Sequence, residues 1–302
     1  MADTRIALLP DRGVVRVTGE DAGKLLQGVV TNDMGLLEAQ PAIHTGLLTP
    51  QGKILFDFFV VCTPDGFLLE TARDKAAGLA DRLMLYRLRA KADIRDVSSD
   101  YSVAAIWGGK YEPHGTGKAP LLFADPRLPA LGSREFVTIG SDWALANEEA
   151  DSATQDEYHA HRIGLGVPEG GKDYAFGDTF PHEALFDQLA GVSFTKGCYV
   201  GQEVVARMKN RGTTRKRIVP VVGTSALPAP GAPIAAGAVE IGTLGSIEGE
   251  HGLALVRIDR VAEFAQKGEA LRAGDVPVRI ELPSWATFSL APASAPAGTP
   301  AA

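Results

Sequence analysis

Apolar residues recur through the first hundred positions with the spacings of helices and strands. The sequence VVRVTG (residues 14–19) predicts a strand, and the positions after it follow the i, i+3, i+4, i+7 spacing of an amphipathic helix. Thr18 and Asp21 are placed like a capping box before that helix. A second helix with its own apolar stripe is expected over residues 74–91.

The run ILFDFFVVC (residues 54–62) alternates like a strand, and the turn PQGK before it predicts a hairpin. On that strand Asp57 shares its face only with leucine, phenylalanine and valine side chains. A carboxylate buried without a partner is costly, and such groups are often functional. The alternatives are a strand-edge aspartate that reaches solvent and an aspartate paired with an arginine.

Three regions differ in their patterns and predict an α+β protein. Strands and helices mix over residues 1–100 and again over 101–215, where a helix is expected near TQDEYHAHRIGLG. Over residues 216–284 short strands alternate with Gly/Pro-rich turns, which is typical of a small β-barrel or sandwich. The Ala/Pro-rich residues 285–302 are expected to form a disordered tail.

The composition narrows the cellular setting. The net charge of −7 argues against nucleic acid as a partner of the molecule as a whole. Two cysteines form no disulfide framework, which favours a reducing compartment. The N-terminal residues lack a signal-peptide pattern, and the longest apolar run is too short for a membrane span. We therefore expect a cytoplasmic protein that does not bind membranes.

The stretch VSFTKGCYVGQEVVARMKNRG (residues 192–212) places Cys198 between two glycines and ahead of a predicted helix. The helix dipole and Lys196 would both stabilise a thiolate at Cys198. The alternative is a small buried residue. Cys62 ends an apolar strand and is expected in the core.

Six basic residues and no acid lie within residues 207–217. They indicate either a solvated helix end or a site for a polyanion or partner, with Arg207, Arg211 and Arg215 as candidates. Glu183 follows a proline and is typical of a helix start. No HExxH, GxGxxG, P-loop or GxSxG spacing occurs, so no dedicated mononuclear metal site or nucleotide site is predicted.

Taken together, these motifs resemble one family. GVSFTKGCYVGQEVVAR, VTGEDAGKLLQGVVTNDM, GLLTPQGKILFDFFV, HRIGLGVPEG and FPHEALFDQLAGVSF resemble, in order, the YgfZ-type folate-binding-like proteins, which include mitochondrial iron–sulfur assembly factors. The segment PEGGKDYAFG looks closer to the mitochondrial-type branch. The wider superfamily is that of the glycine-cleavage aminomethyltransferase. It implies two α/β domains and a C-terminal β-barrel around a central channel.

The resemblance also implies site residues. Asp57 matches an aspartate that serves the transferase's chemistry, so Cys198, Lys196 and Asp57 are the catalytic candidates. The first of two adjacent aspartates is replaced by Phe56, and a pterin-contacting glutamate by Gly164. A channel that could take tetrahydrofolate would be lined by Asn32, Asp57, Arg162, Glu183, Tyr199, Gln202 and Glu203.

The family's role is the assembly or repair of iron–sulfur clusters, especially [4Fe–4S] clusters. A cluster takes about four thiolates, so Cys198 could serve only as one ligand of a cluster shared with a partner, or form a transient adduct. The implied partners are an A-type carrier or glutaredoxin and [4Fe–4S] client enzymes. The alternatives are a tetrahydrofolate-dependent aminomethyl or one-carbon transferase and a tRNA-modification accessory protein. Whether the protein catalyses a reaction is left open.

Overall fold

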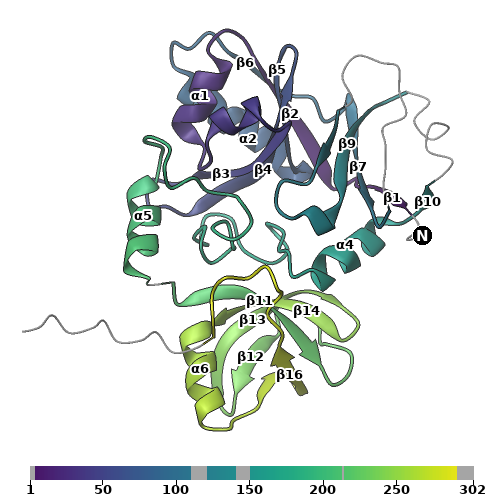
Figure 1. Ribbon diagram of the computed structural model, residues 1–302, viewed down its shortest axis with the longest axis vertical. Coiled ribbons are helices and arrows are strands. Elements are labelled where there is room, and N and C mark those ends of the chain that lie inside the picture. Colours follow the sequence, from purple (N-terminus) through teal and green to yellow (C-terminus); the bar gives the residue numbers. More distant parts are fainter. Residues whose placement is uncertain (1–3, 110–120, 141–149, 213, 291–302) are drawn as a thin grey trace, which may run out of the picture.

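A computed structural model describes residues 4–109, 121–140, 150–212 and 214–290. They form two five-stranded sheets and a closed six-stranded barrel. The sheets lie together in the upper part of Figure 1, and the barrel lies below them. The irregular segments between α4 and α5 run through the space between the sheets and the barrel.

The first sheet has the strand order β3-β4-β5-β2-β6. Two helices and a 3-10 turn pack on one of its faces through a shared apolar core. The strands are β2 (Arg12–Thr18), β3 (Ala42–Leu48), β4 (Ile54–Thr63), β5 (Gly66–Ala72) and β6 (Asp93–Asp96); the helical elements are α1 (Ala22–Val29), η1 (Met34–Glu38) and α2 (Arg73–Arg87).

The second sheet has the order β10-β1-β7-β9-β8. Strand β1, from the N-terminal end of the described residues, pairs antiparallel with β7 and parallel with β10. Residues 5–8 were predicted to belong to the first domain, but they lie in this second sheet. The elements of this part are β1 (Arg5–Leu8), β7 (Tyr101–Trp107), β8 (Leu122–Ala124), η2 (Pro129–Leu131), β9 (Ser133–Thr138), β10 (Asp151–Ser152) and α4 (Gln155–Gly164).

Alternation along β4 sets the two faces of the first sheet. Phe58 and Val60 belong to the core beneath α1 and α2, whereas Phe59 and Val61 pack against the second sheet. This confirms the predicted strand and its two faces. Asp57 shares the parity of Phe59, so its side chain lies on the face turned toward the second sheet.

The barrel closes where β11 pairs with β16, which confirms the predicted barrel. A helix within the barrel region, α6, was not predicted. Helix α5 precedes the barrel. The elements are α5 (Gln202–Arg211), β11 (Lys216–Gly223), β12 (Pro233–Ala236), β13 (Val239–Glu248), β14 (His251–Arg257), α6 (Ile258–Gln266), β15 (Leu271–Ala273) and β16 (Val276–Ile280).

Two local predictions are wrong. Cys62 is exposed rather than buried, because it pairs with Phe67 only one residue pair from the tip of the β4–β5 hairpin. The capping box does not form: Asp21 precedes α1 without a side-chain cap, and its carboxylate accepts from the Lys91 amide instead.

The disordered tail was predicted to begin at residue 285, which is too early in the sequence. Trp285 donates from its indole N–H to the Leu165 carbonyl at 2.9 Å, and Phe288 lies 4.6 Å from the Arg217 guanidinium. Both rings pack on the core formed with the barrel. Residues 285–290 therefore dock, and the rest of the predicted tail lies outside the described residues.

We expect Trp285→Ala to lower the free energy of unfolding by about 2 kcal/mol, because a partly buried aromatic ring and one hydrogen bond are lost. Urea titration followed by circular dichroism would measure it. Ser284→Ala, at an exposed neighbour, should change little. Equal stability of the two variants would contradict docking of this segment.

Candidate functional site

Cys198 lies in an irregular loop, residues 191–201, that leads into α5, and its thiol is exposed. Its exposure removes the alternative of a small buried residue. Gly201, the N-cap of α5, has a φ of 82°, and a Cβ there would lie 2.6 Å from the Thr49 carbonyl oxygen. Glycine is therefore required where the turn between β3 and β4 meets the start of α5.

Lys196 fastens the same loop to the end of α1. Its Nζ donates to the carbonyl oxygens of Gln27, Val30 and Asn32 at 2.8, 2.7 and 2.8 Å. These carbonyls lie at and just beyond the C-terminus of α1, where backbone acceptors are left over and a cation is favoured. Burial lowers the pKa of Lys196 to about 8, against the opposing charge of Asp33.

The three carbonyls take all three N–H donors of the ammonium. No donor remains for a hydrogen bond to the Cys198 thiolate. The geometry therefore gives Lys196 the role of holding the loop in place, and the catalytic role expected for Lys196 stays a prediction.

Lys196→Met should lower the free energy of unfolding by roughly 2–4 kcal/mol, because buried carbonyls lose a charged donor. In a Cys62→Ser background, alkylation of Cys198 by iodoacetamide at neutral pH should stay within about two-fold of the parent rate, since the ammonium does not bond the thiol. Lys24→Met, at an exposed position on α1, is the matched control. Alkylation slowed many-fold with stability unchanged would show that Lys196 activates the thiol.

Asp57 is enclosed by the segment that follows α4. Tyr174 donates its hydroxyl to Asp57 Oδ2 at 2.6 Å, and a Cβ on Gly170 would lie 2.9 Å from Asp57 Oδ1. Burial and the Asp57 charge raise the pKa of Tyr174 well above its usual value, so it stays a donor. Asp57 Oδ1 is buried without a hydrogen-bond partner among the described residues. Asp57 is thus paired, to a tyrosine rather than to an arginine.

A chain of charged side chains connects the first sheet to the second, beside the apolar core that the two sheets share. Glu70, fully buried, pairs with Arg12 at 2.9 Å and approaches Arg134 at 3.5 Å. Arg134 in turn approaches Asp125, which pairs with Arg127 at 2.7 Å. Glu70 Oε2 and Arg134 Nη1 are buried and lack hydrogen-bond partners in the described part of the chain.

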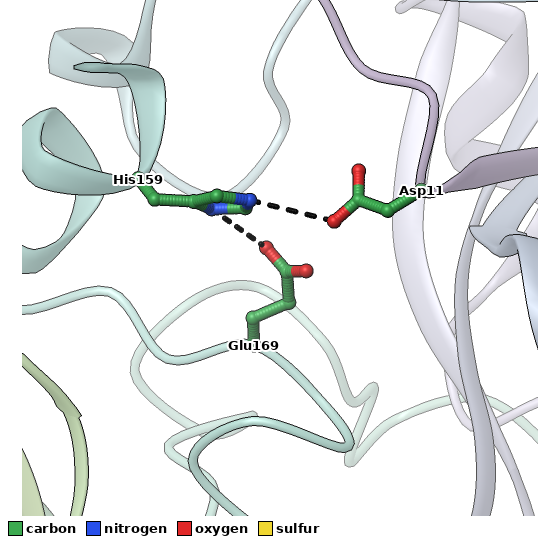
Figure 2. Close-up of side chains that lie close together, drawn as sticks. All are labelled: Asp11, His159 and Glu169. Carbon is green, nitrogen blue, oxygen red and sulfur yellow. Dashed lines mark ion pairs between the residues drawn. The ribbon is translucent and has the colours of Figure 1, made fainter. Parts of the chain in front are cut away.

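At one end of this chain three potential metal ligands converge. Figure 2 shows His159 between Asp11 and Glu169. His159 Nε2 lies 3.4 Å from Asp11 Oδ2, and His159 Nδ1 lies 3.7 Å from Glu169 Oε2. Lys172 Nζ lies 2.7 Å from Asp11 Oδ2, 2.7 Å from His159 Nε2 and 3.2 Å from Glu169 Oε1. The ammonium thus stands where a cation would bind. The cluster borders a cleft of about 430 Å³ whose lining includes Asp74, Lys75 and Phe176.

Glu169 stays ionised in this network. Burial alone would raise its pKa, but the charges of Arg162, Arg12 and Lys172 outweigh that effect and lower the pKa from 4.5 to about 2. A carboxylate with a lowered pKa stabilises the fold at pH values above its unfolded pKa. That contribution is lost as the pH falls from about 4.5 towards 2.

We expect the free energy of unfolding to fall by up to roughly 3 kcal/mol between about pH 5 and pH 2 because of Glu169. Glu169→Gln should lose this part of the pH dependence. It should also be less stable at neutral pH, because the Arg162 guanidinium then lacks the negative charge of Glu169 beside it. Asp65→Asn, at an exposed position, should keep the dependence. Urea titrations across that range would measure it, and parallel curves for all three proteins would refute the assignment.

Of the other predicted channel residues, Asn32 and Glu183 make structural hydrogen bonds. The Asn32 amide donates to the carbonyls of His44 and Ala190 and is buried. Glu183 accepts from the Phe180 amide, as expected for a helix start, although the structure has only a turn there. Burial raises the pKa of Tyr199 to about 12. Gln202 and Glu203 open α5, half-buried and exposed respectively.

Arg162 joins three parts of the molecule. It pairs with Asp173 at 2.7 Å, approaches Glu169 at 3.4 Å and donates to Ser246 of the barrel at 2.7 Å. It also donates to His159 and to the Val167 carbonyl. With a side chain 1% exposed, it is a connecting residue and presents no free face to a ligand.

The six basic residues within residues 207–217 do not share one environment. Arg207 and Arg215 are exposed, and Lys209 lies over the Phe194 ring at 3.6 Å. Arg217 is buried and paired with Asp187 at 2.8 Å, so it takes no part in a surface. The side chain of Arg211 lies outside the described residues.

Tetrahydrofolate, which the superfamily implies, stays a prediction, and two clefts lie beside the positions that it concerns. A Cβ on Gly164 would meet open space, in a cleft of about 400 Å³ that also includes Arg5, Trp107 and His161. That cleft shares no lining residue with the cleft beside Gly170, which abuts Asp57. Tyr174 already donates a hydrogen bond to Asp57 Oδ2.

Comparison with known proteins agrees with the fold. The family model described as the GCVT N-terminal domain matches residues 11–112, and that of the CAF17 C-terminal β-barrel domain matches residues 215–288. The aminomethyltransferase T of the glycine cleavage system from Bartonella henselae superimposes with a TM-score of 0.75 at 15% identity, over 94% of this chain and 87% of that one. The class of protein is thus aminomethyltransferase-like in fold.

Curated relatives narrow the family. The human iron-sulfur cluster assembly factor IBA57, mitochondrial, is 33% identical over 92% of this chain and 84% of its own length. The mouse protein of that name is 34% identical over 84% of this chain and 77% of its own length. The Mycosarcoma maydis homologue is 38% identical over 72% of this chain, which spans only 57% of that relative. This chain belongs to the IBA57 family of iron–sulfur cluster assembly factors.

The relatives also correct the expected location. They are named mitochondrial, which contradicts the cytoplasmic location expected from the sequence. The low number of cysteines indicates only that the protein does not depend on disulfides. It therefore does not distinguish between compartments in which disulfides are rare. Within the described residues no helix has the length and apolar run required to cross a membrane.

Proposed function

We propose that this protein assembles or maintains [4Fe–4S] clusters and that Cys198 supplies one thiolate to a cluster shared with a partner. The observation that carries the proposal is the exposed thiol of Cys198 in a loop that Lys196 and Gly201 hold in place. The names of the relatives, iron-sulfur cluster assembly factors, support the same role.

The number of thiols supports sharing. Iron–sulfur clusters are commonly held by four thiolates, and this chain has two cysteines. Cys62 lies at the tip of the β4–β5 hairpin of the first sheet, and Cys198 lies in the loop before α5. The remaining ligands would come from another protein, so the cluster is a cargo that passes through the complex.

The partner is proposed to be an A-type carrier or a glutaredoxin, which offers thiolates of its own, with [4Fe–4S] enzymes as clients. Arg207 and Arg215 are exposed on the side of α5 and the linker that follow Cys198. They offer an acidic partner surface a place to dock along α5 and the residues after it. Aminomethyl transfer is not proposed, because Phe56 and Gly164 stand where the resemblance implies two carboxylates.

Anaerobic reconstitution with iron, sulfide and a purified A-type carrier should give a coloured complex of the two proteins on gel filtration. Cys198→Ser should abolish the shared cluster, because a hydroxyl is a poor ligand in place of a thiolate. Cys62→Ser is the matched control and should leave the complex unchanged. A cluster retained in Cys198→Ser, or lost equally in both variants, would sink the proposed role of Cys198.

A further inference from the structure

Exposed apolar side chains gather at the C-terminal end of α2. Met84, Leu85 and Leu88 are 40%, 67% and 86% exposed, and the first two lie four and three residues before Leu88. Met84 and Leu85 belong to the last turn of α2, and Leu88 is the residue that follows the helix, so the three lie together at its C-terminal end. The core side of α2 is buried in the core of the first sheet, through Ala76, Leu79, Ala80 and Leu83. We call the three exposed residues the α2 stripe (Met84, Leu85 and Leu88).

Leu88 is presented by a strained turn. Its backbone has φ 47° and ψ −107°, and the Ala90 amide donates to the Arg87 carbonyl at 2.7 Å. This is the first central position of a type II′ turn, where glycine is preferred because a side chain is strained. A leucine there opposes folding and gains almost no burial, since 86% of it is exposed. Neither the backbone nor the core accounts for this residue.

The charge beside the stripe is positive on an acidic molecule. Arg82 and Arg89 are exposed and make no ion pair within the part of the chain that the structure describes. Lys91 is paired with Glu20 at 2.8 Å, and Arg87 donates to the Ala92 carbonyl. Asp81 is the one acid in the second half of α2. Two unpaired guanidinium groups thus flank an apolar stripe on a chain of net charge −7.

We propose that the α2 stripe, with Arg82 and Arg89, is a docking surface for an acidic segment of another protein that presents apolar side chains between carboxylates. The apolar contacts would supply the affinity, and the guanidinium groups would orient the segment and discriminate against basic ones. This surface is on the helical face of the first sheet. It is separate from the Cys198 loop and does not depend on the role of that thiol.

Two other occupants fit the observations less well. A membrane surface would meet only three apolar side chains, with Asp81 next to them. A second copy of this chain, related by a twofold axis, would bring the same unpaired arginines toward each other. Both remain distinct outcomes of the test.

The test uses the full chain and a labelled synthetic helical peptide with leucines on one side and glutamates flanking them. Fluorescence anisotropy should show binding that weakens as salt is added, because part of it is electrostatic. Leu85→Asp and the double variant Arg82→Glu/Arg89→Glu should each weaken binding by about 10-fold or more. Val239→Asp, at an exposed apolar residue of the barrel, should bind within about two-fold of the parent chain.

The variant Leu88→Gly distinguishes an effect on peptide binding from an effect on folding. Glycine relieves the strained turn, so the melting temperature should rise while the affinity for the peptide falls. Absent peptide binding, or equal binding by all variants, would overturn the proposal. So would Leu85-dependent binding to vesicles of phosphatidylcholine and phosphatidylserine without peptide binding, or Leu85-dependent self-association in sedimentation.

Discussion

The buried guanidinium of Arg162 is the interaction on which the arrangement of the parts depends. It reaches from α4 to Asp173 and Glu169 in the following segment and to Ser246 in the barrel. Asp173 also accepts from the Ser246 amide, so the Arg162 guanidinium and the Asp173 carboxylate both bind Ser246 of the barrel. Breaking a buried pair of this kind typically costs 3–5 kcal/mol, because the remaining charge is left without compensation. The segment that encloses Asp57 is therefore held firmly between the sheets and the barrel.

This arrangement explains how one superfamily fold serves a different use. In this chain the region beside Asp57 is filled by the protein itself, through Tyr174 and the charged residues around Glu169. The thiols of Cys62 and Cys198 are both exposed, and Cys198 is the one that we propose as a cluster ligand. The loop that carries it is ordered by polar contacts to backbone atoms, since Lys196 binds three carbonyls and Gly201 fits against Thr49. A rigid loop can offer a thiol to a partner without a surrounding pocket.

Local pattern predicted α1, α2, α4, α5, the alternation of β4 and the barrel, because each depends on burial of neighbouring residues, but it did not predict α6. It did not predict that β1 pairs with β7, since that contact joins residues about a hundred positions apart. The motif around Cys198 indicated a functional cysteine, but the role of Lys196 depends on α1, far away in sequence. Glu70 was missed although it stands between Leu69 and Thr71 in an apolar strand, as Asp57 does in β4. Leu88 shows no signal in sequence, because its strain exists only in the backbone.

The place of β1 has a consequence for how the chain is made. The residues of β1 are synthesised before those of its partners, since Arg5 pairs with Trp107 and with Asp151. The strands of the first sheet, which end at Asp96, are all synthesised before either partner of β1 exists. At about 5–20 residues per second, the N-terminal strand waits several seconds or more without its sheet. During that interval an unpaired apolar edge is exposed, and we infer that translation speed and chaperones influence the yield of this protein more than they would for a chain whose first strand pairs with the second.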